Sequence, residues 1–172
     1  MAKFKVIHRS KNGSDRKYHD ANALNDLIFY IQCEDRTNPS LVGGLAVNPF
    51  AAAEEMEGIT ALAGKQKGVH LRHFIISFSP EELQSAKTAF NIAKDIAEFY
   101  ADRHQIVYAV HTNKCHLHIH FIMNTVSYQT GMKYAGDRKD FYLFQTHMRR
   151  ILHRYGLRQE VQFVKDTGTD SE

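Results

Sequence analysis

The sequence predicts an α+β fold, with a central antiparallel sheet of about five strands and helices packed on it. Segments with strand and helix patterns follow one another along 172 residues, a length that suits one compact core. Two strand-like segments, residues 105–111 and 116–126, are separated by only four residues, which is typical of an antiparallel hairpin. Such a hairpin argues against a doubly wound parallel sheet, where long crossovers join the strands.

The first half of the chain predicts two strands and two helices. Leu24, Ile28 and Ile31 recur at helical spacing after Asp20, a residue that suits a helix N-cap. Pro49 suits the first turn of the second helix. The expected elements are a strand at residues 3–8, a helix from residue 20 to about 34, a short strand at 41–47 and a helix at 50–62.

The second half predicts three strands and two longer helices. Ser79 and Pro80 look like an N-cap and a first helical residue, and Gly156 suits a helix C-terminus. The expected elements are a strand at residues 71–78, a helix from 79 to about 103, the two hairpin strands, and a helix at 139–155. We expect one domain over residues 1–165 and a flexible tail at 166–172 that begins a linker to further domains.

The composition excludes several classes of protein. The formal charge is only +3, so a histone-like coat of positive charge is excluded, although a local basic patch is not. Two cysteines, Cys33 and Cys115, are too few for a disulfide framework and suit a reducing cytoplasm. No segment reaches the roughly 20 apolar residues of a membrane helix, and the N-terminus lacks a secretory signal, so membrane insertion is not expected.

The 11 histidines are the unusual feature, and four of them cluster. His116, His118 and His120 alternate along a predicted strand, so their side chains share one face. Pairing across a four-residue connection places His111 opposite His116, on the same face. Buried together without a ligand, four imidazoles would each need a hydrogen-bond partner. A divalent-metal site explains them better, and three imidazoles suit Zn²⁺, Mn²⁺, Co²⁺ or Ni²⁺ with positions left for substrate.

Four segments in order resemble the relaxase (mobilisation nuclease) family of conjugative elements, within the wider His-hydrophobic-His endonucleases. They are LNDLIFYIQCEDRT from Leu24, NPFAAAEEM from Asn48, LRHFIISFSPEE from Leu71 and YAVHTNKCHLHIHFIMNTV from Tyr108. The first resembles a helix that bears a catalytic tyrosine followed by a basic-Thr turn. The last resembles the metal-binding motif and is the most specific. Together they resemble a MOBP-type tyrosine relaxase of conjugative or mobilisable elements.

The resemblance implies a defined reaction and a defined site. The enzyme would nick one DNA strand at a transfer origin, link its 5′-phosphate to a tyrosine, and rejoin the strand after transfer. Tyr30 matches the nucleophile, and His111, His118 and His120 match the metal ligands. The ion would be Mn²⁺ or Mg²⁺, with Zn²⁺, Co²⁺ or Ni²⁺ as alternatives. The partners would be single-stranded DNA, accessory relaxosome proteins and a type IV secretion coupling protein, in a bacterial cytoplasm and then in the recipient.

Other residues are candidates for supporting roles. His116, His73 and Asn124 could be further ligands or could orient the ligands. Composition and periodicity alone do not select Tyr30, and Tyr18 or His19 is the alternative nucleophile. Basic residues could contact DNA phosphates: Lys65, Lys67, Arg72, Lys133, Arg138 and Lys139.

Three other functions remain open at this stage. A replication-initiator or transposase nuclease would use the same chemistry on a different target. A non-catalytic DNA-binding or metal-binding module would keep the fold without cutting. A cupin-like or hydrolytic metalloenzyme would use the histidines but would give Tyr30 no role.

Overall fold

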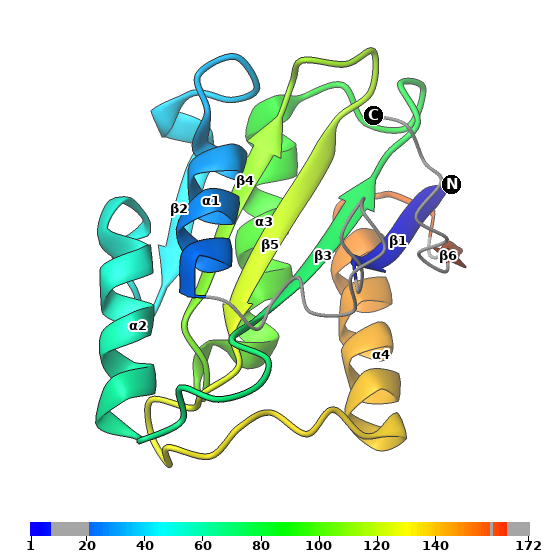
Figure 1. Ribbon diagram of the computed structural model, residues 1–172. Helices are drawn as coiled ribbons and strands as arrows, with labels where there is room; N and C mark the ends of the chain where they lie inside the picture. Colours follow the sequence, from blue (N-terminus) through cyan, green and yellow to red (C-terminus); the bar gives the residue numbers. More distant parts are fainter. Residues whose placement is uncertain (8–20, 159, 165–172) are drawn as a thin grey trace.

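Six strands form one sheet in the order β2-β4-β5-β3-β1-β6 (Figure 1). The computed structural model describes residues 1–7, 21–158 and 160–164, so the predicted cap at Asp20 lies outside the described residues. Neighbouring strands are antiparallel, except β1 and β6, which are parallel. The strands are β1 (Ala2–Ile7), β2 (Val42–Leu45), β3 (Leu71–Ser77), β4 (Ile106–His111), β5 (His118–Asn124) and β6 (Val161–Val164). The predicted α+β class is confirmed, with six strands rather than about five.

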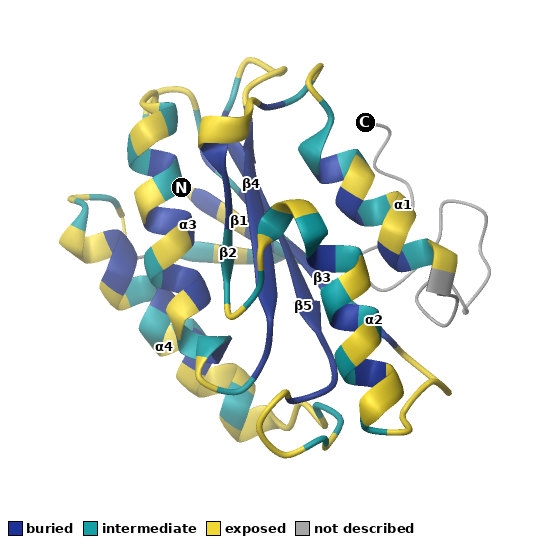
Figure 2. Cartoon of the chain, turned by 90° about the vertical axis from the view of Figure 1, so that its left-hand side faces the viewer, coloured by how far each residue is buried: buried dark blue, intermediate teal, exposed yellow. Residues whose placement is uncertain are grey.

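The helices cover both faces of the sheet (Figure 2). They are α1 (Ala21–Gln32), α2 (Ala52–Leu62), α3 (Ala86–Ala101) and α4 (Arg138–Arg154), with short 3₁₀ turns at Pro39–Leu41 and Pro49–Ala51. The helices α3 and α4 bury one face, where Ile96 and Phe144 meet Phe121 of β5 in the larger core. The helices α1 and α2 pack on the other face through a smaller core that includes Ile31 and Met56. None of the helices in the described part of the chain is long and apolar enough to cross a bilayer.

Alternation along β5 separates an apolar face from a histidine face. Leu117, Ile119 and Phe121 belong to the core under α3 and α4, as predicted. His118 and His120 therefore project to the opposite face, the side of the sheet on which α1 lies. The second face of this buried strand therefore carries histidines at positions where aliphatic side chains are usual.

The predicted register of the β4–β5 hairpin is wrong by two residues. His111 pairs with His118, not with His116, and the connection has six residues instead of four. The chain leaves the ladder early because other partners take its backbone groups. Thr112 N donates to Arg36 O over 2.8 Å, and Leu117 O accepts from Phe78 N over 3.0 Å. Since a shift of two residues keeps the same face, His118 and His120 remain beside His111 while His116 moves into the connection.

The start of α3 also differs from the prediction. The Ser79–Glu82 segment forms one isolated turn, because Ser79 O accepts from Glu82 N and Leu83 N. The helix begins at Ala86, where the side chain of Ser85 accepts from Thr88 N. The predicted cap at Ser79 is therefore wrong, and Ser85 caps the helix.

Strand β6 was not predicted. It has four residues and pairs only at the sheet edge, in parallel with β1 from the far end of the chain. So short a segment gives a weak sequence pattern. The strand that it pairs with is more than 150 residues away in sequence, as the pair Lys3 and Gln162 shows.

Gly43 provides a stability test of the sheet. It pairs with Tyr108, and a Cβ at Gly43 would overlap the buried Tyr108 ring. Replacing Gly43 by Ala should lower the free energy of unfolding by about 1–3 kcal/mol, measured by chemical denaturation. Gly58 in α2 is the matched control, because a Cβ there meets nothing within 4 Å. Gly58→Ala should raise stability by roughly 0.5–1 kcal/mol, and equal effects of the two substitutions would contradict the packing at Gly43.

Candidate functional site

Three histidines gather where β4 ends and β5 begins. His111, His118 and His120 are buried, and one ring nitrogen of each lies within 4.8 Å of the other two. The ring centroids of His111 and His120 are 4.2 Å apart, and those of His111 and His118 are 5.0 Å apart. We call these three residues the histidine triad. Their spacing allows all three imidazoles to reach one common ligand.

In two of these rings, a hydrogen bond to one nitrogen determines which nitrogen is left for a ligand. His111 Nε2 donates to Ile31 O over 2.9 Å, since a carbonyl can only accept, and this puts the lone pair of His111 on Nδ1. His120 Nδ1 lies 2.9 Å from His73 Nε2, so His120 presents its Nε2. That Nε2 and Nδ1 of His118 are buried, and no described group hydrogen-bonds to either one. Two buried ring nitrogens of the triad are thus available to a ligand.

Burial keeps the imidazoles of His118 and His120 neutral. It lowers the pKa of His118 to about 4, and the nearby His111 adds to the effect. It lowers the pKa of His120 well below its usual value, with smaller contributions from neighbouring charges that include His73 and Arg36. A neutral imidazole has the lone pair that metal coordination needs.

The donor set fits a divalent metal ion. One ring nitrogen from each of three histidines lies within 4.8 Å of the other two. Two buried ring nitrogens of the triad have no described hydrogen-bond partner, and the His111 ring is held by a backbone carbonyl. Orientation of metal-binding histidines by a hydrogen bond to the other ring nitrogen is a general property of such sites. Three protein ligands would leave coordination positions for a substrate oxygen.

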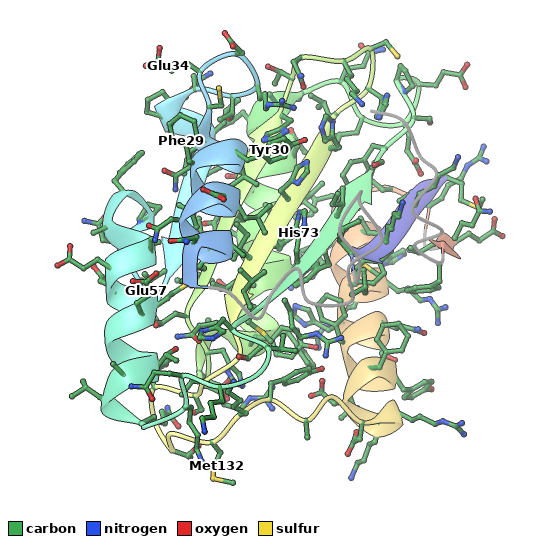
Figure 3. All side chains as sticks on the ribbon, viewed as in Figure 1. Phe29, Tyr30, Glu34, Glu57, His73 and Met132 are labelled. Atoms are coloured by element: carbon green, nitrogen blue, oxygen red, sulfur yellow. The ribbon has the colours of Figure 1, made fainter. Side chains whose placement is uncertain are left out.

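Tyr30 lies beside the triad (Figure 3). It is half-buried near the C-terminal end of α1, with its ring centroid 5.9 Å from that of His120 and 6.0 Å from that of His111. Its neighbour Phe29 points away from the sheet and is 76% exposed. The hydrogen bond from His111 to Ile31 O ties this turn of α1 to the triad. The helix therefore places the Tyr30 ring on the histidine face of the sheet.

Arg36 contacts Tyr30 and was not selected from the sequence. Its Nη1 donates to Tyr30 Oη over 3.1 Å, and its guanidinium carbon lies 4.1 Å from the centroid of the tyrosine ring. The only sequence signal was a basic residue in the turn that follows the tyrosine helix. Surface arginines are common in turns, so this signal did not distinguish Arg36 from other basic residues.

The three supporting candidates occupy different positions. His73 joins the site, because its ring stacks on His120 with centroids 5.2 Å apart. His116 is half-buried in the β4–β5 connection, 5.6 Å from His118 between ring centroids, and is not part of the triad. Asn124 lies at the other end of β5, where its amide donates to Met56 O and Gln105 Oε1. Its observed bonds tie β5 to α2 and to the residue before β4.

The predicted DNA-contacting residues lie toward the opposite end of the sheet from the triad. Lys65 and Lys67 are exposed between α2 and β3, and Lys133 Nζ donates to the carbonyl of Lys67 over 2.6 Å. Arg72 pairs with Met123, on the opposite face of the sheet from His120, and its guanidinium carbon lies 4.9 Å from the centroid of the Tyr134 ring. Arg138 and Lys139 are exposed in the first turn of α4. The structure does not bring these residues to the triad.

Tyr18 and His19, the alternative nucleophiles, lie outside the described residues. The geometry therefore gives a position for Tyr30 alone among the three candidates.

The chain is similar to known relaxases. A family model for the MobA/VirD2-like relaxase nuclease domain matches residues 30–157. The protein rlx of Staphylococcus aureus is 33% identical over 114 residues, covering 66% of this chain and 36% of that protein. A second rlx protein of the same species is 38% identical over 79 residues, covering 46% and 24%. The group II intron-interrupted relaxase LtrB of Lactococcus lactis is 25% identical over 168 residues, covering 75% and 30%.

The chain spans about a quarter to a third of the length of these relatives. The family match begins at Tyr30 and includes His73 and the whole triad. Most of the described fold lies inside it, from the end of α1 to just after α4. The chain therefore belongs to the relaxase family and carries its MobA/VirD2-like nuclease domain.

Proposed function

We propose that this chain is a metal-dependent nicking and rejoining domain that acts on one DNA strand at a transfer origin. The observation that carries the proposal is the placement of the Tyr30 ring beside His111 and His120, two members of a triad of buried histidines. A hydrolytic metalloenzyme would need no such tyrosine. The relaxase relatives support DNA as the substrate.

The reaction is a transesterification. Tyr30 Oη forms a bond to the scissile phosphorus, and the bond from phosphorus to the 3′-oxygen breaks. The phenol proton is lost from Tyr30, and the leaving 3′-oxygen gains a proton to give a free 3′-hydroxyl. The 5′-phosphate stays on the tyrosine, so the reverse reaction can rejoin the strand without an external energy source.

The histidine triad would bind a divalent metal ion, and its neighbours would orient the ligand rings. A divalent ion bound by His111 Nδ1, His120 Nε2 and a ring nitrogen of His118 would supply stabilisation of negative charge on the non-bridging phosphate oxygens. Neutral ligands leave the charge of Mn²⁺ or Mg²⁺ undiminished for this purpose. Ile31 O and His73 would fix the rings of His111 and His120.

His73 gives a test of the metal site that does not need DNA. Removing the partner of His120 Nδ1 frees the His120 ring to rotate and to change tautomer. His73→Ala should therefore weaken Mn²⁺ binding by about 10- to 100-fold, measured by isothermal titration calorimetry. His73→Gln, which can still accept from His120 Nδ1, should recover part of the affinity. His153→Ala, at an exposed position near the end of α4, is the control. Unchanged affinity in His73→Ala would show that His73 does not orient a ligand.

Single-stranded DNA would extend beyond the site. Lys65, Lys67, Lys133, Arg72, Arg138 and Lys139 are proposed to contact phosphates some distance from the nick, and DNA affinity should then fall steeply with salt. Lys133 has less capacity for this than the others, because its ammonium already donates to two carbonyls, Lys67 O and Val69 O. Accessory relaxosome proteins and a type IV secretion coupling protein are the proposed partners, in the bacterial cytoplasm.

The polarity of the covalent link tests the proposal. The protein is incubated with Mn²⁺ and single-stranded DNA from the transfer origin of its own element, labelled at either the 3′ or the 5′ end. We expect the 3′-labelled fragment to become attached to protein on a denaturing gel, and the 5′-labelled fragment to be released with an extendable 3′-hydroxyl. Cleavage without attachment would indicate a hydrolase, and attachment of the 5′-labelled fragment would indicate the opposite polarity. Activity only on a replication origin or a transposon end would support the initiator or transposase alternative.

A further inference from the structure

The Arg36 side chain makes two contacts with the same tyrosine. Its Nη1 donates to Tyr30 Oη over 3.1 Å, while the guanidinium carbon lies 4.1 Å from the centre of the Tyr30 ring. A planar cation that lies over a ring while hydrogen-bonding its hydroxyl limits the positions that the hydroxyl can take. Arg36 thus contacts the oxygen atom that would react.

The backbone holds Arg36 between the tyrosine helix and the histidine strands. Its N–H donates to Cys33 O over 2.9 Å, just after α1, and its carbonyl accepts from Thr112 N over 2.8 Å, just after His111. The next residue, Thr37, is buried. Because these bonds involve main-chain atoms, they remain available when the Arg36 side chain is replaced.

We infer that Arg36 is a catalytic residue that stabilises negative charge on Tyr30 Oη; this inference rests on the proposed function. Charge develops on this oxygen as the phenol proton leaves during cleavage. It develops again during rejoining, when the Oη–phosphorus bond breaks, a new 3′-oxygen–phosphorus bond forms, and the tyrosine oxygen is the leaving group. The incoming 3′-hydroxyl loses its proton, and Tyr30 regains one.

Arginine suits this role better than a general base would. The guanidinium keeps its charge at every physiological pH, so Arg36 supplies a donor and a positive charge but takes no proton. It has five N–H donors, and only one is used on Tyr30. The remaining donors are suited to a phosphate oxygen, which a planar guanidinium can bind with two parallel hydrogen bonds.

Single-turnover kinetics of Arg36→Ala test the inference. The rates of adduct formation and of rejoining to an added 3′-hydroxyl oligonucleotide should both fall by about 100-fold, the usual effect of losing one preorganised donor to a developing oxyanion. The affinity for uncleaved DNA should change much less than the rate, and Mn²⁺ affinity should stay close to that of the wild type. Arg36→Lys keeps the positive charge but lacks the planar guanidinium, so its rates should lie between those of the wild type and those of Arg36→Ala. Arg158→Ala removes an exposed arginine near β6 and is the charge-matched control.

Chemical rescue separates catalysis from structure. Guanidinium ion at non-denaturing concentrations should raise the rate of Arg36→Ala and leave Arg158→Ala unchanged. A wild-type rate in Arg36→Ala would overturn the role of Arg36 and leave the nicking function standing. The same conclusion would follow if the rate fell, guanidinium did not restore it, and the affinity for DNA or Mn²⁺ fell by the same factor. Absence of a covalent adduct with the wild-type protein would instead overturn the proposed function itself.

Discussion

Tyr30→Phe is expected to abolish formation of the covalent protein–DNA adduct. The phenylalanine ring can keep the position beside His111 and His120, but the oxygen that would attack phosphorus is gone. Loss of a nucleophile typically lowers the rate by on the order of 10⁴-fold or more. The measurement is the single-turnover rate of adduct formation with end-labelled DNA.

Tyr18→Phe is the matched control for this experiment. Tyr18 is the alternative nucleophile from the sequence, and its replacement should leave adduct formation largely intact. Tyr30→Phe should still bind uncleaved DNA, because the change removes one hydroxyl and no charge. Adduct formation by Tyr30→Phe at a rate near that of the wild type would exclude Tyr30 as the nucleophile.

Replacement of His118 or His120 by Ala should remove both the metal and the activity. Each substitution deletes one of the three proposed metal ligands and leaves a gap in a buried position. Because losing a residue that only orients a ligand costs 10- to 100-fold in affinity, losing a ligand should cost on the order of 100-fold or more. Mn²⁺ binding is measured by calorimetry, and adduct formation is measured at saturating Mn²⁺.

His116→Ala is the matched control for this experiment. His116 is close in sequence and in space, but it lies in the connection between β4 and β5 and outside the triad. Its replacement should change Mn²⁺ affinity far less than replacement of His118 or His120. An equal loss in His116→Ala would mean that the ion is held by a different set of histidines.

The histidine face could be predicted because it depends only on local periodicity. Side chains two residues apart on a strand share a face, so His118 and His120 were placed together without knowledge of the rest of the fold. The prediction that His111 shares this face is correct although the predicted register is wrong, because the register differs by an even number of residues. His116 was misplaced by the same error, since the length of a connection depends on its tertiary partners, Arg36 and Phe78.

Features that depend on distant parts of the chain could not be predicted. The stacking of His73 on His120 follows from the sheet order. Arg36 and Tyr30 are only six residues apart, but the turn that carries Arg36 is bonded to Thr112, from a distant part of the chain. Basic residues near the predicted hairpin in sequence, such as Lys133, lie toward the other end of β5 in space. Sequence patterns predicted the histidines and Tyr30 as candidate site residues, whereas tertiary packing determined which residues surround them.

Peptide mapping of the covalent adduct tests the central claim most directly. After nuclease digestion, cleavage before aspartate separates the two tyrosines: residues 15–19 contain Tyr18 and His19, whereas residues 26–34 contain Tyr30 alone. We predict a nucleotide 5′-phosphate remnant on the peptide of residues 26–34, located on Tyr30 by fragmentation in the mass spectrometer. A remnant on the peptide of residues 15–19 would contradict the assignment of Tyr30 as the nucleophile.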